Sequence, residues 1–97
     1  MFARLTIVEV PTDKVDYVIK IFEDSIVPAA KSQKGAHGIH MLADRSTGKG
    51  IALSFWDSEE DAITNEQSGY YQEQVSKVAQ YFTKSPIREG YEVSVQA

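Results

Sequence analysis

The chain has two histidines, His37 and His40, and their side chains are the ones best suited to proton transfer near neutral pH. A spacing of three would place both rings on one face of a helix, whereas residues three apart on a strand point to opposite faces. Residues 38–43 are expected to form a strand, so the two rings should not share a metal ion and we predict no metal site. Each histidine is therefore either a general base or a half-buried residue at the rim of the core.

The pairing of two strands decides which histidine shares a face with Trp56, the only tryptophan. An even number of residues between strands 38–43 and 50–56 would place His37 on the face of Trp56 and Ser54, and an odd number would place His40 there. Small residues beside one large indole can leave a ligand cavity. The alternative is that Trp56 fills the space between sheet and helices. The residues that share this face under the even count are His37, Ile39, Met41, Ala52, Ser54 and Trp56.

A third group of candidate residues is aromatic and lies near the end of the chain. Tyr71 belongs to a stripe at helical spacing, which favours packing in the core. Tyr70 and Tyr81 fall outside this stripe and are candidates for a pocket mouth or an interface. The stripe consists of Tyr71, Val75, Val78 and Phe82.

Alternating strands and helices must position these residues. Residues 3–10 are rich in β-branched side chains and stop at Pro11, as is typical of a strand. Thr12 or Asp13 should cap a helix whose apolar stripe runs to residue 26, and Pro28 should kink or end that helix. Further strands are expected at 38–43, 50–56 and 91–96, with a hairpin turn at 44–49. A second helical region should start at a Ser58 cap, break near residue 69 and continue through 71–82. The order β-α-β-β-α-β predicts an α+β fold with a ferredoxin-like antiparallel sheet.

Apolar residues occur on both faces of several expected strands. In the first strand Leu5 and Ile7 point one way, and Val8 and Val10 point the other way. Two apolar faces imply that both are covered, although a lone sheet of this kind would leave one face in water. The simplest cover for the second face is another copy of the chain across a two-fold axis, so we expect a homodimer. A monomer with scattered surface apolar residues is the alternative.

Composition limits the class of protein. With 97 residues and 42% hydrophobic residues, the chain is expected to form a single domain over residues 1–97. The absence of cysteine excludes disulfides and thiolate chemistry. A net charge of −4 argues against nucleic-acid binding, and no apolar run is long enough to predict a membrane span. No signal-peptide pattern is visible after Met1, so the expected location is the cytoplasm.

The segment Trp56-Asp57-Ser58-Glu59-Glu60-Asp61-Ala62, together with the element order, resembles the antibiotic biosynthesis monooxygenase-like proteins of the dimeric α+β barrel superfamily. The segment Gly35-Ala36-His37-Gly38 before the second strand is also similar to that family. The resemblance extends over nearly the whole chain. It implies a homodimer whose two sheets face each other, with a pocket between sheet and helices in each subunit.

The resemblance also implies an activity and a set of site residues. Some family members oxidise polyketide-type aromatics with O2 and no bound cofactor, whereas others bind and degrade heme. Trp56 matches the tryptophan that lines the pocket of active members. The family's asparagine in the first strand is replaced around Thr6 or Ile7. The histidine of the heme-degrading branch falls near Gln74 and Val75, so heme degradation is disfavoured and no cofactor is predicted. Heme binding without turnover stays open as a third alternative.

Two functions follow as hypotheses. The first is a cofactor-independent monooxygenase, an oxidoreductase that acts on a small aromatic or quinol-like substrate. In it Trp56 packs on the ligand, His37 or alternatively His40 is the base, and Thr6, Ser54 and Tyr71 are polar wall residues. The second is a non-catalytic barrel that binds a small ligand or supports a stress response. The shortage of convergent polar groups favours the second hypothesis. The sequence names neither a substrate nor a pathway.

Overall fold

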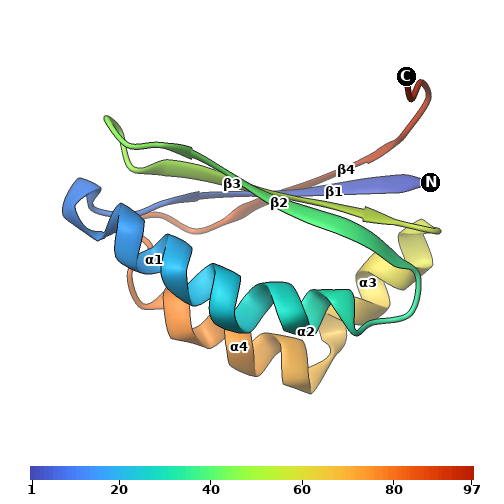
Figure 1. Ribbon diagram of the computed structural model, residues 1–97, viewed down its shortest axis with the longest axis horizontal. Helices are drawn as coiled ribbons and strands as arrows, with labels where there is room; N and C mark the ends of the chain where they lie inside the picture. The colour runs from blue at the N-terminus through green and yellow to red at the C-terminus, as the bar shows by residue number, and fades with distance from the viewer.

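The computed structural model describes residues 1–97 and contains one four-stranded antiparallel sheet with helices on one side (Figure 1). The strands follow the order β2-β3-β1-β4, which confirms the ferredoxin-like arrangement. No helix is both long and apolar enough to cross a membrane. The elements are β1 Phe2–Glu9, α1 Val15–Ile21, α2 Val27–Lys31, β2 Ala36–Asp44, β3 Lys49–Trp56, α3 Glu59–Gln67, α4 Gly69–Ala79 and β4 Ile87–Glu92.

The register of the strands fixes which side chains point toward the helices. Thr6 of β1 pairs with Ala52 of β3, and Ala52 pairs with Met41 of β2. The connection between β2 and β3 therefore has the even count, and odd positions of β2 share a face with even positions of β3. Ile39 pairs with Ser54 in the same way. A register shift between residues 36 and 38 interrupts this pattern at His37.

Of the two predicted helix caps, one is present in the structure and the other is not. The Ser58 Oγ accepts a hydrogen bond from the Asp61 amide at 3.1 Å, which confirms the expected cap of α3. The prediction of a cap at Thr12 or Asp13 is wrong, because residues 12–14 form a 3₁₀ turn and α1 begins after Lys14 without a side-chain cap. The chain must turn tightly there to bring the helix back under the sheet.

The last strand begins and ends earlier than predicted. It covers Ile87–Glu92 rather than residues 91–96. Its partner is β1, and the pairing runs from Ile7 opposite Ile87 to Phe2 opposite Glu92. The Val93 amide also donates a hydrogen bond to the Met1 carbonyl. The pairing with β1 therefore covers residues that the predicted range left in a connection.

The main core lies between the sheet and the helices. A cluster of buried apolar side chains joins α1, the segment after it and α4, and it contains Val10, Val15, Val18, Phe22, Ile26 and Val78. Trp56, which is 1% exposed, fills the same layer at the end of β3. These contacts attach the helices to one face of the sheet only (Figure 1).

The opposite face of the sheet also carries apolar residues, as the sequence predicts, and no element of the chain covers it (Figure 1). One row of this face crosses all four strands and has an apolar side chain in each. Two of its members are strongly exposed, with 49% of Leu42 and 58% of Ile87 accessible. The row consists of Leu42, Ile51, Ile7 and Ile87. We refer to this side as the open face.

Candidate functional site

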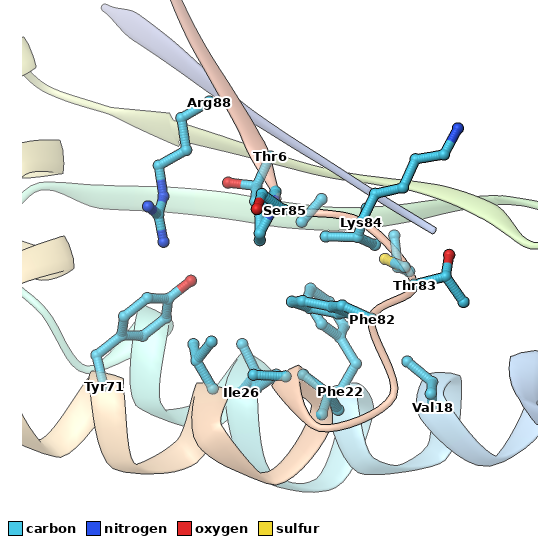
Figure 2. Close-up of a pocket in the computed structure, with 17 residues that line it drawn as sticks. Thr6, Val18, Phe22, Ile26, Tyr71, Phe82, Thr83, Lys84, Ser85 and Arg88 are labelled. Atoms are coloured by element: carbon cyan, nitrogen blue, oxygen red, sulfur yellow. The ribbon is translucent and has the colours of Figure 1, made fainter. Parts of the chain in front are cut away.

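A cavity of about 560 Å³ lies between the sheet and the helices. This volume is within the range of cavities that hold small organic ligands. Its walls are mainly apolar, with Phe22 and Ile26 on one helical side and Tyr71 on the other (Figure 2). The lining residues are Thr6, Val8, Val18, Phe22, Ile26, Met41, Ala52, Tyr71, Val75, Val78, Ala79, Phe82, Thr83, Lys84, Ser85, Pro86 and Arg88.

The sheet side of the cavity is built from one row of paired residues. Arg88 pairs with Thr6, Thr6 with Ala52, and Ala52 with Met41, so the row crosses all four strands. The small Ala52 side chain in a central strand leaves room beneath the sheet. Arg88 at one end of the row is long enough to reach into that room (Figure 2).

Arg88 and Tyr71 form the polar end of the cavity. The Arg88 side chain descends from β4 and the Tyr71 hydroxyl points up from α4 toward it (Figure 2). Lys84, Thr83 and Ser85 lie in the connection before β4 and supply further polar groups to the lining. The arrangement offers a cation and a hydroxyl donor to an oxygen atom of a ligand whose body is apolar.

Burial raises the pKa of Tyr71 above its ordinary value of 10.0. The positive charge of Arg88 opposes this change, the negative charge of Glu66 adds to it, and a hydrogen bond with Asn65 opposes it. The Glu66 carboxylate is itself held by the Arg4 Nε at 2.5 Å. The Tyr71 hydroxyl therefore remains protonated at neutral pH and acts as a hydrogen-bond donor.

Trp56 and Ser54 lie on the helix-covered face but outside the cavity lining. The Trp56 Nε1 donates a hydrogen bond to the Ser54 Oγ at 2.9 Å, which satisfies the buried indole. The two side chains thus fill the layer between sheet and helices beside the cavity. This placement agrees with the alternative that the sequence left open, in which Trp56 fills the space between sheet and helices.

The two histidines lie away from the cavity. His37 sits in the irregular part of β2, where its Nε2 pairs with the Asp57 carboxylate at the partly exposed surface. His40 lies on the open face, where its ring meets the Phe55 ring edge-on at a centroid distance of 6.2 Å. Two of the six residues predicted for the site, Thr6 and Tyr71, line the cavity. The other four do not line it: Trp56, Ser54, His37 and His40. No three His, Cys, Asp or Glu side chains lie together in a way that could hold a metal ion.

Arg88 is the polar site residue that sequence reasoning missed. The expected last strand began at residue 91 and left Arg88 in a connection. The sequence signal was weak, because Ile87 and Tyr91 share a strand face but the charged Glu89 between them breaks the apolar and polar alternation. An arginine on the same face as Thr6 then follows from the pairing of these two residues.

Relatives in sequence are uncharacterized proteins of Mycobacterium tuberculosis. Rv2557 is 28% identical over 98 residues, which cover 97% of this chain and 41% of the relative. Rv2558 is 35% identical over 60 residues, which cover 62% of this chain and 25% of the relative. The chain thus spans about two fifths of the length of Rv2557 and a smaller share of Rv2558. No family model matches the chain.

Similar solved structures are named as candidate antibiotic biosynthesis monooxygenases. One from Bordetella bronchiseptica has a TM-score of 0.84 at 14% identity and covers 97% of each chain. Another from Nitrosomonas europaea has a TM-score of 0.82 at 14% identity, covering 98% of this chain and 100% of that one. The resemblance noted in the sequence is confirmed for the fold: this chain has the antibiotic biosynthesis monooxygenase-like fold.

Proposed function

We propose that this protein binds a small phenol or quinol-like aromatic in the cavity and oxidises it with O2 without a bound cofactor. The fold of the candidate monooxygenases supports an oxygenase-type activity. The shape and lining of the cavity support the class of substrate, because its apolar walls suit an aromatic ring system and its polar end suits one oxygen atom.

The observation that carries the proposal is the presence of Arg88 and the hydroxyl of the partly buried Tyr71 at one end of an apolar cavity (Figure 2). A ligand oxygen placed between them would accept hydrogen bonds from both groups. The positive charge of Arg88 favours the ionised form of that oxygen and lowers the pKa of the bound phenol. The resulting anion is electron-rich, and such anions react with O2 more readily than the neutral phenol does.

The reaction needs no further reductant when the substrate resembles anthrone. In such a substrate a methylene group is conjugated through the rings to the oxygen that ionises. One atom of O2 becomes a carbonyl oxygen on that carbon and the other leaves as water. The methylene group supplies both hydrogens of the water and the four electrons. The chain's own residues bind the oxygen through Arg88 and Tyr71 and orient the rings against Phe22 and Phe82. Because His37 and His40 lie outside the lining, no proton-transfer role is assigned to them.

A second candidate function is ligand binding without catalysis. It is favoured by the lining itself, which contains no carboxylate and no imidazole that could act as a general base. An apolar cavity with a cation at one end would hold an aromatic anion without converting it. Both functions require the same cavity and the same ligand class, so they differ only in whether the bound ligand is consumed.

Oxygen consumption and calorimetric binding, measured on the same preparations, separate the two functions. Anthrone and 1,4-naphthohydroquinone are suitable probes, with binding measured under argon. The proposal expects catalysed O2 uptake that falls at least about tenfold in Arg88→Leu, since a hydrogen bond to a charged group contributes about 1.5–3 kcal/mol. Arg45→Leu, which removes an exposed arginine paired with Asp16, should leave the rate unchanged. Binding without uptake would establish the second function, and absence of binding would reject both.

We also infer that the biological partner is a second copy of the chain, joined through the open face. The open face carries an uninterrupted apolar row across the sheet, and Leu42 and Ile87 of that row are about half exposed. Apolar surface of this extent is stabilised by burial against another apolar surface. A two-fold interface supplies such a surface from the same residues.

A further inference from the structure

The long helical segment beside the cavity changes its hydrogen-bonding pattern in the middle. It is α-helical from Val15 to Ile21, forms a π-turn at Phe22–Ile26 and is α-helical again from Val27 to Lys31. In the π-turn the Val27 amide donates to the Phe22 carbonyl, five residues earlier, rather than to that of Glu23. Such turns are rare and occur frequently at functional sites.

Pro28 explains the position of the π-turn. Proline has no amide hydrogen, and in a regular α-helix its ring would clash with the carbonyl four residues earlier, here that of Asp24. A wider turn before the proline relieves this clash. It also starts a new α-helical segment at Val27, so Pro28 lies in a first turn, where a missing amide hydrogen costs least.

The π-turn decides which side chains face the cavity. A regular α-helix rotates about 100° per residue, so Ile26 would lie about 80° around the axis from Val18. The wider turn rotates less per residue and returns Ile26 toward the line of Val18 and Phe22. All three side chains are buried and all three line the cavity (Figure 2).

We propose that Pro28 is a specificity-determining residue: by maintaining the π-turn it holds Val18, Phe22 and Ile26 on one cavity wall and sets the size of aromatic ligand that fits. This inference rests on the proposed function, because it takes the cavity to be the binding site of an aromatic ligand. Pro28 itself does not line the cavity and acts through Ile26. Restoring an amide hydrogen at position 28 permits a regular α-helix, in which Ile26 turns toward the edge of the face that Val18 and Phe22 present and the shape of this cavity wall changes.

The structural part is tested on Pro28→Ala by NMR couplings across hydrogen bonds. In the unmodified protein the Val27 amide should couple to the Phe22 carbonyl, and in Pro28→Ala it should couple to the Glu23 carbonyl. Coupling to Phe22 that persists in the variant would overturn the role of Pro28. This measurement needs no ligand, so its result does not depend on the proposed function.

The selectivity part is tested by calorimetry under argon with phenol, 2-naphthol and 2-anthrol. The ratio of the 2-anthrol affinity to the phenol affinity should fall about tenfold in Pro28→Ala, comparable to the change that one methylene makes in an apolar pocket. Pro11→Ala, a proline replacement outside the cavity lining, should keep the ratio. An unchanged ratio in Pro28→Ala would reject the selectivity role alone. Failure of the unmodified protein to bind any of the three phenols would reject the proposed function and the selectivity role together.

Discussion

Two neighbouring rows of residues cross the same four strands and face opposite sides of the sheet. The row on the helix side consists of Met41, Ala52, Thr6 and Arg88, and it mixes a small residue, a hydroxyl and a cation. The row on the open face consists of Leu42, Ile51, Ile7 and Ile87, one residue further along or back in each strand, and it is entirely apolar. The alternation of a strand thus lets one segment of sequence serve two surfaces.

The comparison shows how the composition of each surface suits its proposed partner. A small ligand needs a concave space with few, well-placed polar groups, and the alanine and arginine of the helix-side row supply these. A second sheet needs a broad apolar surface, and four β-branched or leucine side chains supply it. The same strand register therefore couples the position of the cavity to the position of the proposed dimer interface.

The largest expected effect is the loss of dimerisation when a charge is placed on the open face. In Leu42→Asp a charge enters the proposed interface twice, once per subunit, and each buried charge should cost at least about 3 kcal/mol. The dimer, of mass twice 10.8 kDa, should become a monomer of 10.8 kDa in size-exclusion chromatography with light scattering. Leu42 is about half exposed within one chain, so the far-ultraviolet circular dichroism should be retained.

Ile63→Asp is the matched control for this experiment, because Ile63 is a partly exposed apolar residue that lies on α3 and not on the open face. It should leave the mass at that of the dimer. A monomeric unmodified protein, or equal dissociation of both variants, would contradict the assignment of the interface to the open face.

The next effect is a loss of stability when Trp56, which fills the space between sheet and helices beside the cavity, is replaced. Trp56→Ala removes a fully buried indole and should lower the free energy of unfolding by about 3–5 kcal/mol in urea titrations. Trp56→Phe keeps most of the volume but leaves Ser54 without its 2.9 Å partner, and should cost less. If both variants lost the same stability, the contribution of Trp56 could not be attributed to its volume.

A smaller effect separates the cavity from the interface. Ala52→Leu adds side-chain volume at the centre of the helix-side row and should weaken the binding of 2-naphthol by about 10- to 100-fold, equivalent to about 1.4–2.7 kcal/mol. The mass should remain that of the dimer, because Ala52 points away from the open face. Ile51→Leu, one residue earlier and on the opposite face, is the matched control and should leave 2-naphthol binding intact. Loss of dimerisation in Ala52→Leu would show that the two faces are not independent.

The smallest effect comes from the titration of Tyr71. Its pKa is raised in the folded state by burial, so the unfolded chain releases the tyrosine proton first as the pH rises. The stabilisation is therefore complete below pH 10 and is lost as the pH rises from there toward the folded pKa. Tyr71→Phe should lose less stability than the unmodified protein between neutral pH and this alkaline range. Tyr70→Phe, which changes an exposed tyrosine, should follow the unmodified protein.

Local patterns in the sequence predicted much of the fold. The alternation of the strands predicted the two faces with apolar residues, the spacing of Tyr71, Val75 and Val78 predicted the helix α4, and Ser58 marked the beginning of α3. The sequence left the even and the odd count between the second and third strands open, and the structure has the even count, which places Ile39 and Met41 on the face of Ala52 and Ser54. These features depend on neighbours in sequence or on one hairpin.

Other features depend on contacts between distant segments and could not be predicted in the same way. The bounds of β4 follow from its pairing with β1 at the other end of the chain, from Ile7 opposite Ile87 to Phe2 opposite Glu92, so Arg88 remained outside the predicted strand. The position of His37 follows from an irregularity in β2 that simple alternation does not contain. Pro28 predicted an interruption of the helix, but the π-turn and its effect on Ile26 follow from the packing of that helix over the cavity.

The most direct test of the separation between the two faces is methyl NMR of the labelled protein during titration with 2-naphthol. We expect the methyl signals of Val18, Ile26 and Val78, which line the cavity, to shift. The methyl signals of Leu5, Leu53 and Ile51, on the open face, should not shift. Shifts confined to the open face, or no shift at any methyl group at millimolar ligand, would contradict the assignment of the cavity as the ligand site.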